Sequence, residues 1–130
     1  MTSSRHGLID ETCSCRGNSL DRFIQPNLLY LLSFNEKYGY ELIQELSNLP
    51  MFFNSNIDKT GVYRALDKLE AQKRITSYWD SSVKGPQKKM YCLTESGNAC
   101  IASWIETLKI HITHLTALTL RLEERIDKDE

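Results

Sequence analysis

Apolar residues recur with a seven-residue period over the last part of the chain. Two interleaved series carry the repeat: Ile101, Leu108, Leu115 and Leu122 in one, and Ile105, Ile112, Thr119 and Ile126 in the other. Such a repeat is typical of a helix that packs along a second helix, and β-branched residues in one series with leucine mainly in the other favour two strands. The repeat therefore predicts a long dimerisation helix from about Glu95 to Ile126.

The alternative is a monomeric helix packed on its own domain. A helix this long would extend beyond the core that a chain of 130 residues can build, so we prefer a homodimer. The pattern leaves open whether the two helices run parallel or cross. The predicted dimer interface is Ile101, Ile105, Leu108, Ile112, Leu115 and Leu122.

Before this helix, the sequence predicts a polar arm followed by a small helical domain. Residues 1–19 are predicted to form a flexible N-terminal arm, 20–94 a compact domain and 95–130 the coiled-coil segment. Apolar spacing predicts three helices, at about 20–34, 38–49 and 59–74. Pro26 requires that the first helix either begins near it or is kinked there. Asp58 is the expected N-cap of the third helix, with Val62, Leu66 and Leu69 buried.

Two β-branched and aromatic runs follow the third helix. Ile75–Trp79 and Met90–Thr94 flank a polar segment with Gly85-Pro86, which predicts a two-stranded hairpin with a basic tip. Thr94 can then cap the last helix. Helices followed by such a hairpin predict a mainly α (α+β) fold, a winged helix-turn-helix with a two-stranded wing and a long C-terminal dimerisation helix.

Four motifs occur in order between Tyr38 and Gly97: YGYEL at 38–42, TGVYRALDKLE at 60–70, ITSYW at 75–79 and KMYCLTESG at 89–97. Together they resemble the PadR family of transcriptional regulators. The single terminal helix resembles that of the short branch of the family. The sequence WDS at 79–81, together with Gly85-Pro86, resembles the poly-β-hydroxybutyrate-responsive repressors. One position departs from the family, in which the third helix usually ends on glycine; here Lys73 and Arg74 stand at that end.

The third helix and the wing carry the predicted DNA site. With the apolar stripe inward, the polar side chains of the third helix face outward. Arg64 can pair with guanine, Thr60 can touch a base or phosphate, and the resemblance implies that Tyr63 contacts the DNA backbone through its hydroxyl. Lysines on the third helix and on the wing are suited to contacts with DNA phosphates. The full set is Lys59, Thr60, Tyr63, Arg64, Lys68, Lys84, Lys88 and Lys89.

Two further sites are open to more than one interpretation. The resemblance implies a signal that relieves repression, in some relatives through an aromatic pocket at the dimer centre. Trp104 lies beside the predicted seam, one turn before the tryptophan of drug-binding relatives, so it is either a core residue or an effector contact. No cofactor is expected, although Cys13 and Cys15 could hold zinc or another soft metal, sense oxidants, or be exposed reduced thiols.

Several classes of protein are disfavoured. No glycine-rich phosphate loop, nucleophile elbow or spaced carboxylate pair is present, which argues against an enzyme. No apolar run reaches the length of a membrane span, and the N-terminus does not read as a signal peptide, so a cytoplasmic protein is expected. The predicted function is a homodimeric repressor on a pseudo-palindromic operator in double-stranded DNA. The near-neutral charge of −1 also permits an alternative, a winged-helix adaptor that binds a protein or a polymer-granule surface.

Overall fold

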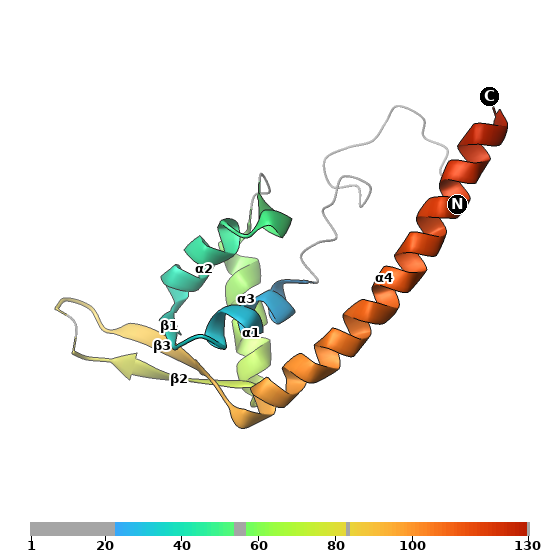
Figure 1. Cartoon of the computed structure of the whole chain (residues 1–130). Coiled ribbons are helices and arrows are strands. Elements are labelled where there is room, and N and C mark those ends of the chain that lie inside the picture. Colours follow the sequence, from blue (N-terminus) through green and yellow to red (C-terminus); the bar gives the residue numbers. More distant parts are fainter. Residues whose placement is uncertain (1–22, 54–56, 83, 130) are drawn as a thin grey trace.

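The computed structural model describes residues 23–53, 57–82 and 84–129. In chain order the elements are α1 (Ile24–Leu32), β1 (Lys37–Tyr38), α2 (Gly39–Ser47), the 3₁₀ helix η3 (Pro50–Phe52), α3 (Lys59–Ala71), β2 (Ile75–Asp80), β3 (Lys88–Leu93) and α4 (Glu95–Asp129). The first three helices and the sheet form a small domain, from which the hairpin and α4 extend (Figure 1). This is the winged-helix arrangement that the sequence predicts.

The sheet has three strands, one more than predicted. Its order is β1-β3-β2, and β3 pairs antiparallel with both neighbours. The extra strand β1 places Lys37 opposite Tyr91 and Tyr38 opposite Met90. A two-residue strand has no alternation that a sequence pattern could reveal, because it is defined only by its partner strand.

The core lies where α1, α2, α3 and the sheet meet. The predicted inner face of α3 is confirmed, since Val62, Leu66 and Leu69 are almost fully buried. They pack with further apolar side chains: Ile24, Leu28, Leu29, Leu31, Leu32, Leu42, Leu46, Phe52, Ile75 and Tyr91. On α2 the buried stripe is Gly39, Leu42 and Leu46, which leaves Tyr40 50% exposed.

The ends of α1 and α3 follow from local chemistry. α1 begins at Ile24, which puts Pro26 in the first turn, where its missing N–H leaves no helical hydrogen bond unmade. α3 ends at Ala71, three residues earlier than predicted, and Lys73 adopts a left-handed backbone with φ of 63°. The Lys73 N–H donates to Glu70 O and the Arg74 N–H to Leu69 O, both at 2.9 Å. This is a Schellman ending built on lysine.

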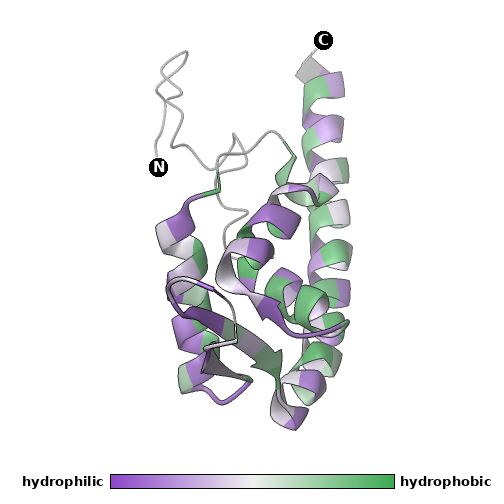
Figure 2. Ribbon diagram, turned by 90° about the vertical axis from the view of Figure 1, so that its left-hand side faces the viewer, coloured by the Kyte–Doolittle hydropathy of each residue, from purple (hydrophilic) through white to green (hydrophobic). Residues whose placement is uncertain are grey.

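Thr94 joins the end of α3 to the start of α4. Its hydroxyl accepts from the Gly97 N–H at 3.0 Å, which confirms it as the cap of α4, and lies within donating distance of the carbonyls of Lys73 (2.7 Å) and Arg74 (2.8 Å). From this joint α4 runs 35 residues, about 52 Å at 1.5 Å per residue. Figure 2 shows apolar residues recurring along it well beyond the domain. No helix in the described part of the chain has both the length and the hydropathy to cross a bilayer.

Candidate nucleic-acid interface

The outward face of α3 carries all five of the side chains predicted for it: Lys59, Thr60, Tyr63, Arg64 and Lys68 are exposed. The start of the helix is fixed by Asp58, whose carboxylate accepts from the Thr60 N–H at 3.1 Å. This confirms the predicted N-cap and holds the first turn in a defined direction. The exposed face is therefore presented by a rigid helix packed on the core through its opposite side.

Tyr63 lies against the start of α2. A Cβ built on Gly39 would come within 2.9 Å of the Tyr63 ring and hydroxyl, so the ring can lie this close to the start of α2 only because residue 39 is glycine. The Tyr63 side chain is still 40% exposed. It therefore both packs between the two helices and reaches the surface.

The three wing lysines differ in what surrounds them. Lys84 is exposed near the tip. Lys88 is exposed, and its ammonium lies 4.9 Å from the centroid of the Tyr40 ring. Lys89 is half-buried, and its Nζ lies 3.8 Å from Glu70 Oε1 on α3. The Lys89 ammonium thus pairs with Glu70 on α3, while Lys84 and Lys88 remain exposed.

A hollow of about 420 Å³ separates the wing from the helices. Aromatic rings and both wing-base lysines surround it, namely Tyr38, Tyr40, Tyr63, Trp79, Lys88, Lys89 and Tyr91, with Gly39 and Asp67. Burial, together with nearby Asp67 and Glu70, raises the pKa of Tyr91 to about 12, so its hydroxyl stays protonated. Tyr38, Tyr40 and Trp79 were not predicted as site residues; their surroundings depend on contacts between distant elements.

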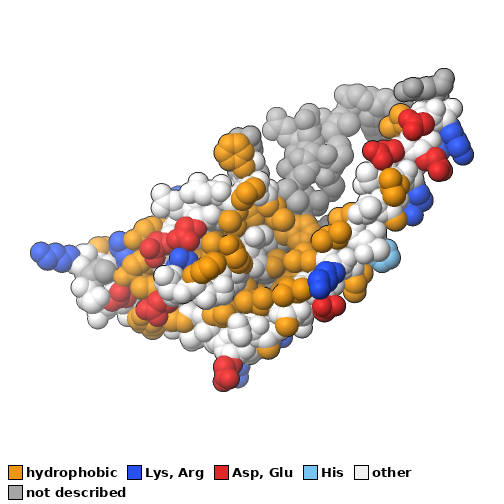
Figure 3. Space-filling model, viewed as in Figure 1, with side chains coloured by type: hydrophobic (Ala, Val, Ile, Leu, Met, Phe, Trp, Pro, Cys, Tyr) orange, Lys and Arg blue, Asp and Glu red, His pale blue; other side chains and the backbone are white. Residues whose placement is uncertain are grey.

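Four cations at this surface have no acidic partner among the described residues: Lys59, Arg64, Lys68 and Lys84. The described salt bridges engage other lysines, such as Lys37 with Glu45. Figure 3 shows basic side chains interspersed with acidic ones at the wing end of the molecule, and an apolar band that runs toward α4. Unpaired cations on a helix and beside it on a hairpin suit a polyanion that spans both elements.

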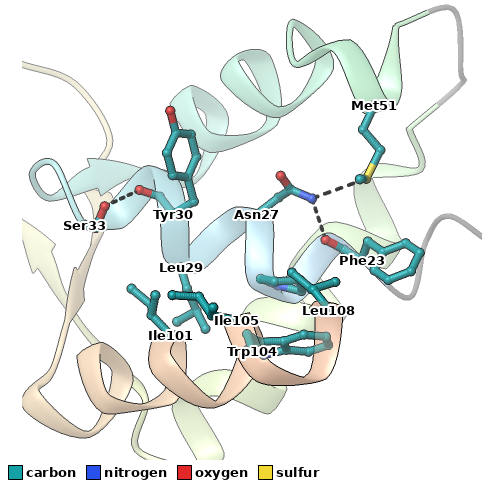
Figure 4. A pocket seen from close by; sticks show the side chains of 11 residues that line it. Phe23, Asn27, Leu29, Tyr30, Ser33, Met51, Ile101, Trp104, Ile105 and Leu108 are labelled. Carbon is teal, nitrogen blue, oxygen red and sulfur yellow. Dashed lines mark hydrogen bonds between the residues drawn. The ribbon is translucent and has the colours of Figure 1, made fainter. Parts of the chain in front are cut away.

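A second hollow, this one apolar, lies between α1 and α4, and Figure 4 shows its lining. It measures about 370 Å³, and Leu29 and Tyr30 on α1 face Ile101, Trp104 and Leu108 on α4. Ile101 and Trp104 pack against the core of their own chain. Farther along α4, Ile112 is 63% exposed, Leu115 55% and Leu122 56%. The predicted interface residues therefore divide between this groove and a bare apolar face beyond it.

The predicted metal ligands Cys13 and Cys15 lie outside the described residues. Within the described ranges, no three His, Cys, Asp or Glu side chains come together as a metal site. Cys92 and Cys100 are free thiols. The Cys92 thiol donates to Glu36 Oε2 at 3.2 Å, and burial followed by this carboxylate raises its pKa to about 11.

Known proteins share both the sequence pattern and the fold. A curated protein from Lysinibacillus sphaericus, itself uncharacterized, is 31% identical over 88 residues, which are 64% of this chain and 79% of that one. A PadR-like transcriptional regulator from Bacillus cereus superposes with a TM-score of 0.63 at 25% identity, covering 78% of this chain and 95% of the other. A regulator from Clostridium thermocellum gives 0.67 at 21% identity, covering 76% and 95%.

One similar structure contains nucleic acid. Bacillus subtilis PadR in complex with operator DNA matches with a TM-score of 0.57 at 28% identity, over 65% of this chain and 46% of that longer one. Residues 28–103, from α1 to the start of α4, match the family described as the transcriptional regulator PadR-like family. With more than half of its length in that match, the chain belongs to the PadR-like family of transcriptional regulators, which are DNA-binding regulators and not enzymes.

Proposed function

We propose that this protein is a sequence-specific repressor that binds a pseudo-palindromic operator as a homodimer and is released by an effector. The observation that carries the DNA-binding part is the pairing of two surfaces. Unpaired cations on α3 lie beside a wing with a free lysine at its tip. A helix of this kind enters the major groove while an adjacent hairpin reaches flanking phosphates.

The side chains take separate roles within that surface. Arg64, exposed in the middle of α3, is the residue that can form a bidentate pair with guanine. Lys59, Lys68 and Lys84 neutralise phosphates, which sets position without reading sequence. Thr60 and Tyr63 lie on the same face, and the Tyr63 hydroxyl would donate to the backbone. Lys88 contributes charge at the wing base, whereas Lys89 is largely occupied by Glu70.

Selection of bound fragments from genomic DNA, followed by fluorescence anisotropy, tests this function. The wild-type protein should bind a selected fragment far more tightly than random DNA, with log K falling linearly as log salt rises. Lys84→Ala should weaken binding to both DNAs alike, while Lys109→Ala on α4, away from this surface, should leave both unchanged. Absence of DNA binding, with capture of a protein or polymer instead, would favour the adaptor function.

We also propose that a second copy covers the groove between α1 and α4. The apolar face of α4 continues from that groove through Ile112, Leu115 and Leu122, all more than half exposed. A single soluble chain rarely leaves such a stripe in water, and the seven-residue spacing suits another helix. In a two-fold assembly each α4 would cover the groove of the other chain.

Trp104 is the candidate effector contact in this proposal. Its indole lies in the groove together with Leu108, the position of the tryptophan in drug-binding relatives (Figure 4). An apolar planar compound entering between the two chains would change the environment of this ring. Quenching of tryptophan fluorescence that is lost in Trp104→Phe but kept in Trp79→Phe, together with release of DNA, would support this role; DNA release that survives Trp104→Phe would contradict it.

A further inference from the structure

The base of the wing is joined to the start of α2 by a hydrogen bond between residues far apart in sequence. The Tyr38 hydroxyl donates to Asp80 Oδ2 at 2.5 Å. Tyr38 immediately precedes α2, and Asp80 is the last residue of β2, where the wing loop begins. The bond therefore connects the helix-turn-helix unit to the outgoing strand of the wing.

The returning strand of the wing is held at the same place. Lys88, the first residue of β3, lies opposite Asp80 in the sheet register. Its ammonium lies 4.9 Å from the Tyr40 ring centroid and 5.9 Å from that of Tyr38. These two rings are stacked, with centroids 5.6 Å apart and planes within 9°. Both strands of the wing are thus anchored on one pair of tyrosines at the start of α2.

Asp80 also organises the turn beyond it. Its Oδ1 accepts from the Ser82 hydroxyl at 2.6 Å and from the Ser82 N–H at 2.9 Å. These bonds, with the Tyr38 hydroxyl, hold the pKa of the Asp80 carboxyl below its usual range. The same carboxylate therefore binds both the loop and the helical unit. In the described part of the wing beyond it, Lys84 has no ion-pair partner that could fix the tip by another route.

We propose that Tyr38 is a positioning residue for DNA binding: through Asp80 and the stacked Tyr40, it sets the angle of the wing so that the wing lysines and α3 engage one DNA molecule together. This rests on the proposed function. A rigid joint matters because ordering a free wing at the moment of binding costs conformational entropy, and an already ordered wing avoids that cost. Tyr38 itself need not touch DNA.

The test is Tyr38→Phe, which removes the hydroxyl but keeps the ring, the stacking and the net charge. The matched control is Tyr78→Phe. Tyr78 makes the same kind of bond, from its hydroxyl to Glu36 Oε1 at 2.8 Å, but two residues before Asp80, so its loss leaves the bond at the start of the wing loop in place. Binding to a selected fragment is measured by anisotropy over a range of salt concentrations, and melting temperature is recorded for each variant.

Tyr38→Phe should bind about fivefold to tenfold more weakly. The slope of log K against log salt should also fall by about one unit for each phosphate contact that the wing loses. Tyr78→Phe should keep the affinity and the slope of wild type, even if its melting temperature falls by as much as that of Tyr38→Phe. A merely structural role for Tyr38 would lower the melting temperature without changing the slope.

Substitutions of Asp80 separate the hydrogen bond from the charge. Asp80→Ala removes a negative charge near DNA, which by electrostatics alone strengthens binding, whereas loss of the joint weakens it. We expect Asp80→Ala to bind DNA more weakly than wild type. Asp80→Asn keeps a hydrogen-bond acceptor and should bind DNA more tightly than Asp80→Ala. If Tyr38→Phe equals Tyr78→Phe in affinity and slope while wild type binds DNA, the positioning role alone is overturned. If wild type binds no DNA, the proposed function is overturned and this role with it.

Discussion

Gly97 in the first turn of α4 lies directly against the carbonyl oxygen of Arg74 at the end of α3. A Cβ at residue 97 would overlap that oxygen, and would also lie 2.6 Å from Leu93 Cδ1. Because backbone atoms cannot move aside cheaply, the contact requires glycine. It determines where α4 leaves the domain, and therefore how the apolar stripe of α4 is presented.

We expect Gly97→Ala to destabilise the protein by about 3 kcal/mol, the upper part of the range for overpacking. The control is Gly61→Ala in α3, where an added Cβ would meet only Asp58 atoms at 3.8 Å. That change should be neutral or stabilising by up to about 1 kcal/mol, since alanine is the better helix former. Urea unfolding gives the free energy of unfolding of both variants. Equal values for Gly97→Ala and Gly61→Ala would contradict the close contact at Gly97.

Lys73 is the residue at which the helix ending can be improved. Its left-handed backbone, φ 63°, costs a residue with a side chain about 1 kcal/mol, which glycine avoids. Lys73→Gly should therefore raise the free energy of unfolding by about 1 kcal/mol, whereas Lys73→Ala should not. Gln72→Gly, one residue earlier with φ of −84°, should be destabilising. A Lys73→Gly variant no more stable than Lys73→Ala would show that the lysine is not strained.

Cys92 should react slowly with alkylating agents. Its pKa, raised from the ordinary 9.0 to about 11 by burial and the Glu36 carboxylate, lowers the thiolate fraction at pH 8 by ~100-fold. The neutral thiol favours the folded state fully below about pH 9, and this contribution is lost as the pH rises through 11. Iodoacetamide labelling read by peptide mass spectrometry should show this, with faster labelling after Glu36→Gln or in urea. Labelling at pH 8 as fast as in urea would contradict the raised pKa.

The proposed dimer face of α4 can be broken at a single position. Leu115→Glu places a charge in the middle of the apolar stripe, where burial would cost several kcal/mol. Thr113→Glu is the matched control, because two residues along a helix turn the side chain to nearly the opposite side. Sedimentation velocity at micromolar concentration should find wild type and Thr113→Glu dimeric and Leu115→Glu monomeric. Dimers in all three would place the interface elsewhere.

Local patterns predicted most of this fold. The buried stripe of α3, the Asp58 and Thr94 caps and the long final helix all follow from residues within one or two turns of each other. The features that the sequence did not predict depend on contacts between residues far apart in the chain. Strand β1 exists only because β3 pairs with it, and Tyr38 meets Asp80 across 42 residues. Which side of α2 carries Tyr40 could not be predicted either, because the buried face of a short helix depends on its first residue.

The candidate site shows the same division. Exposure of the α3 side chains follows from the helical period, so Arg64 and its neighbours could be chosen from sequence. The engagement of Lys89 by Glu70 could not, because it depends on how β3 crosses α3. The division of α4 between a groove on its own chain and a bare stripe also required the packing of α1 against Ile101 and Trp104.

The ratio of specific to random DNA affinity for Arg64→Ala tests the central claim most directly. Arg64 is exposed on α3 and has no acidic partner among the described residues, so its removal should leave the fold intact. We expect wild type to prefer a selected fragment by at least ~1,000-fold, and Arg64→Ala to lose about tenfold to a hundredfold of that ratio, with a smaller loss on random DNA. An unchanged ratio, or equal losses on both DNAs, would contradict the assignment of α3 as the element that reads sequence.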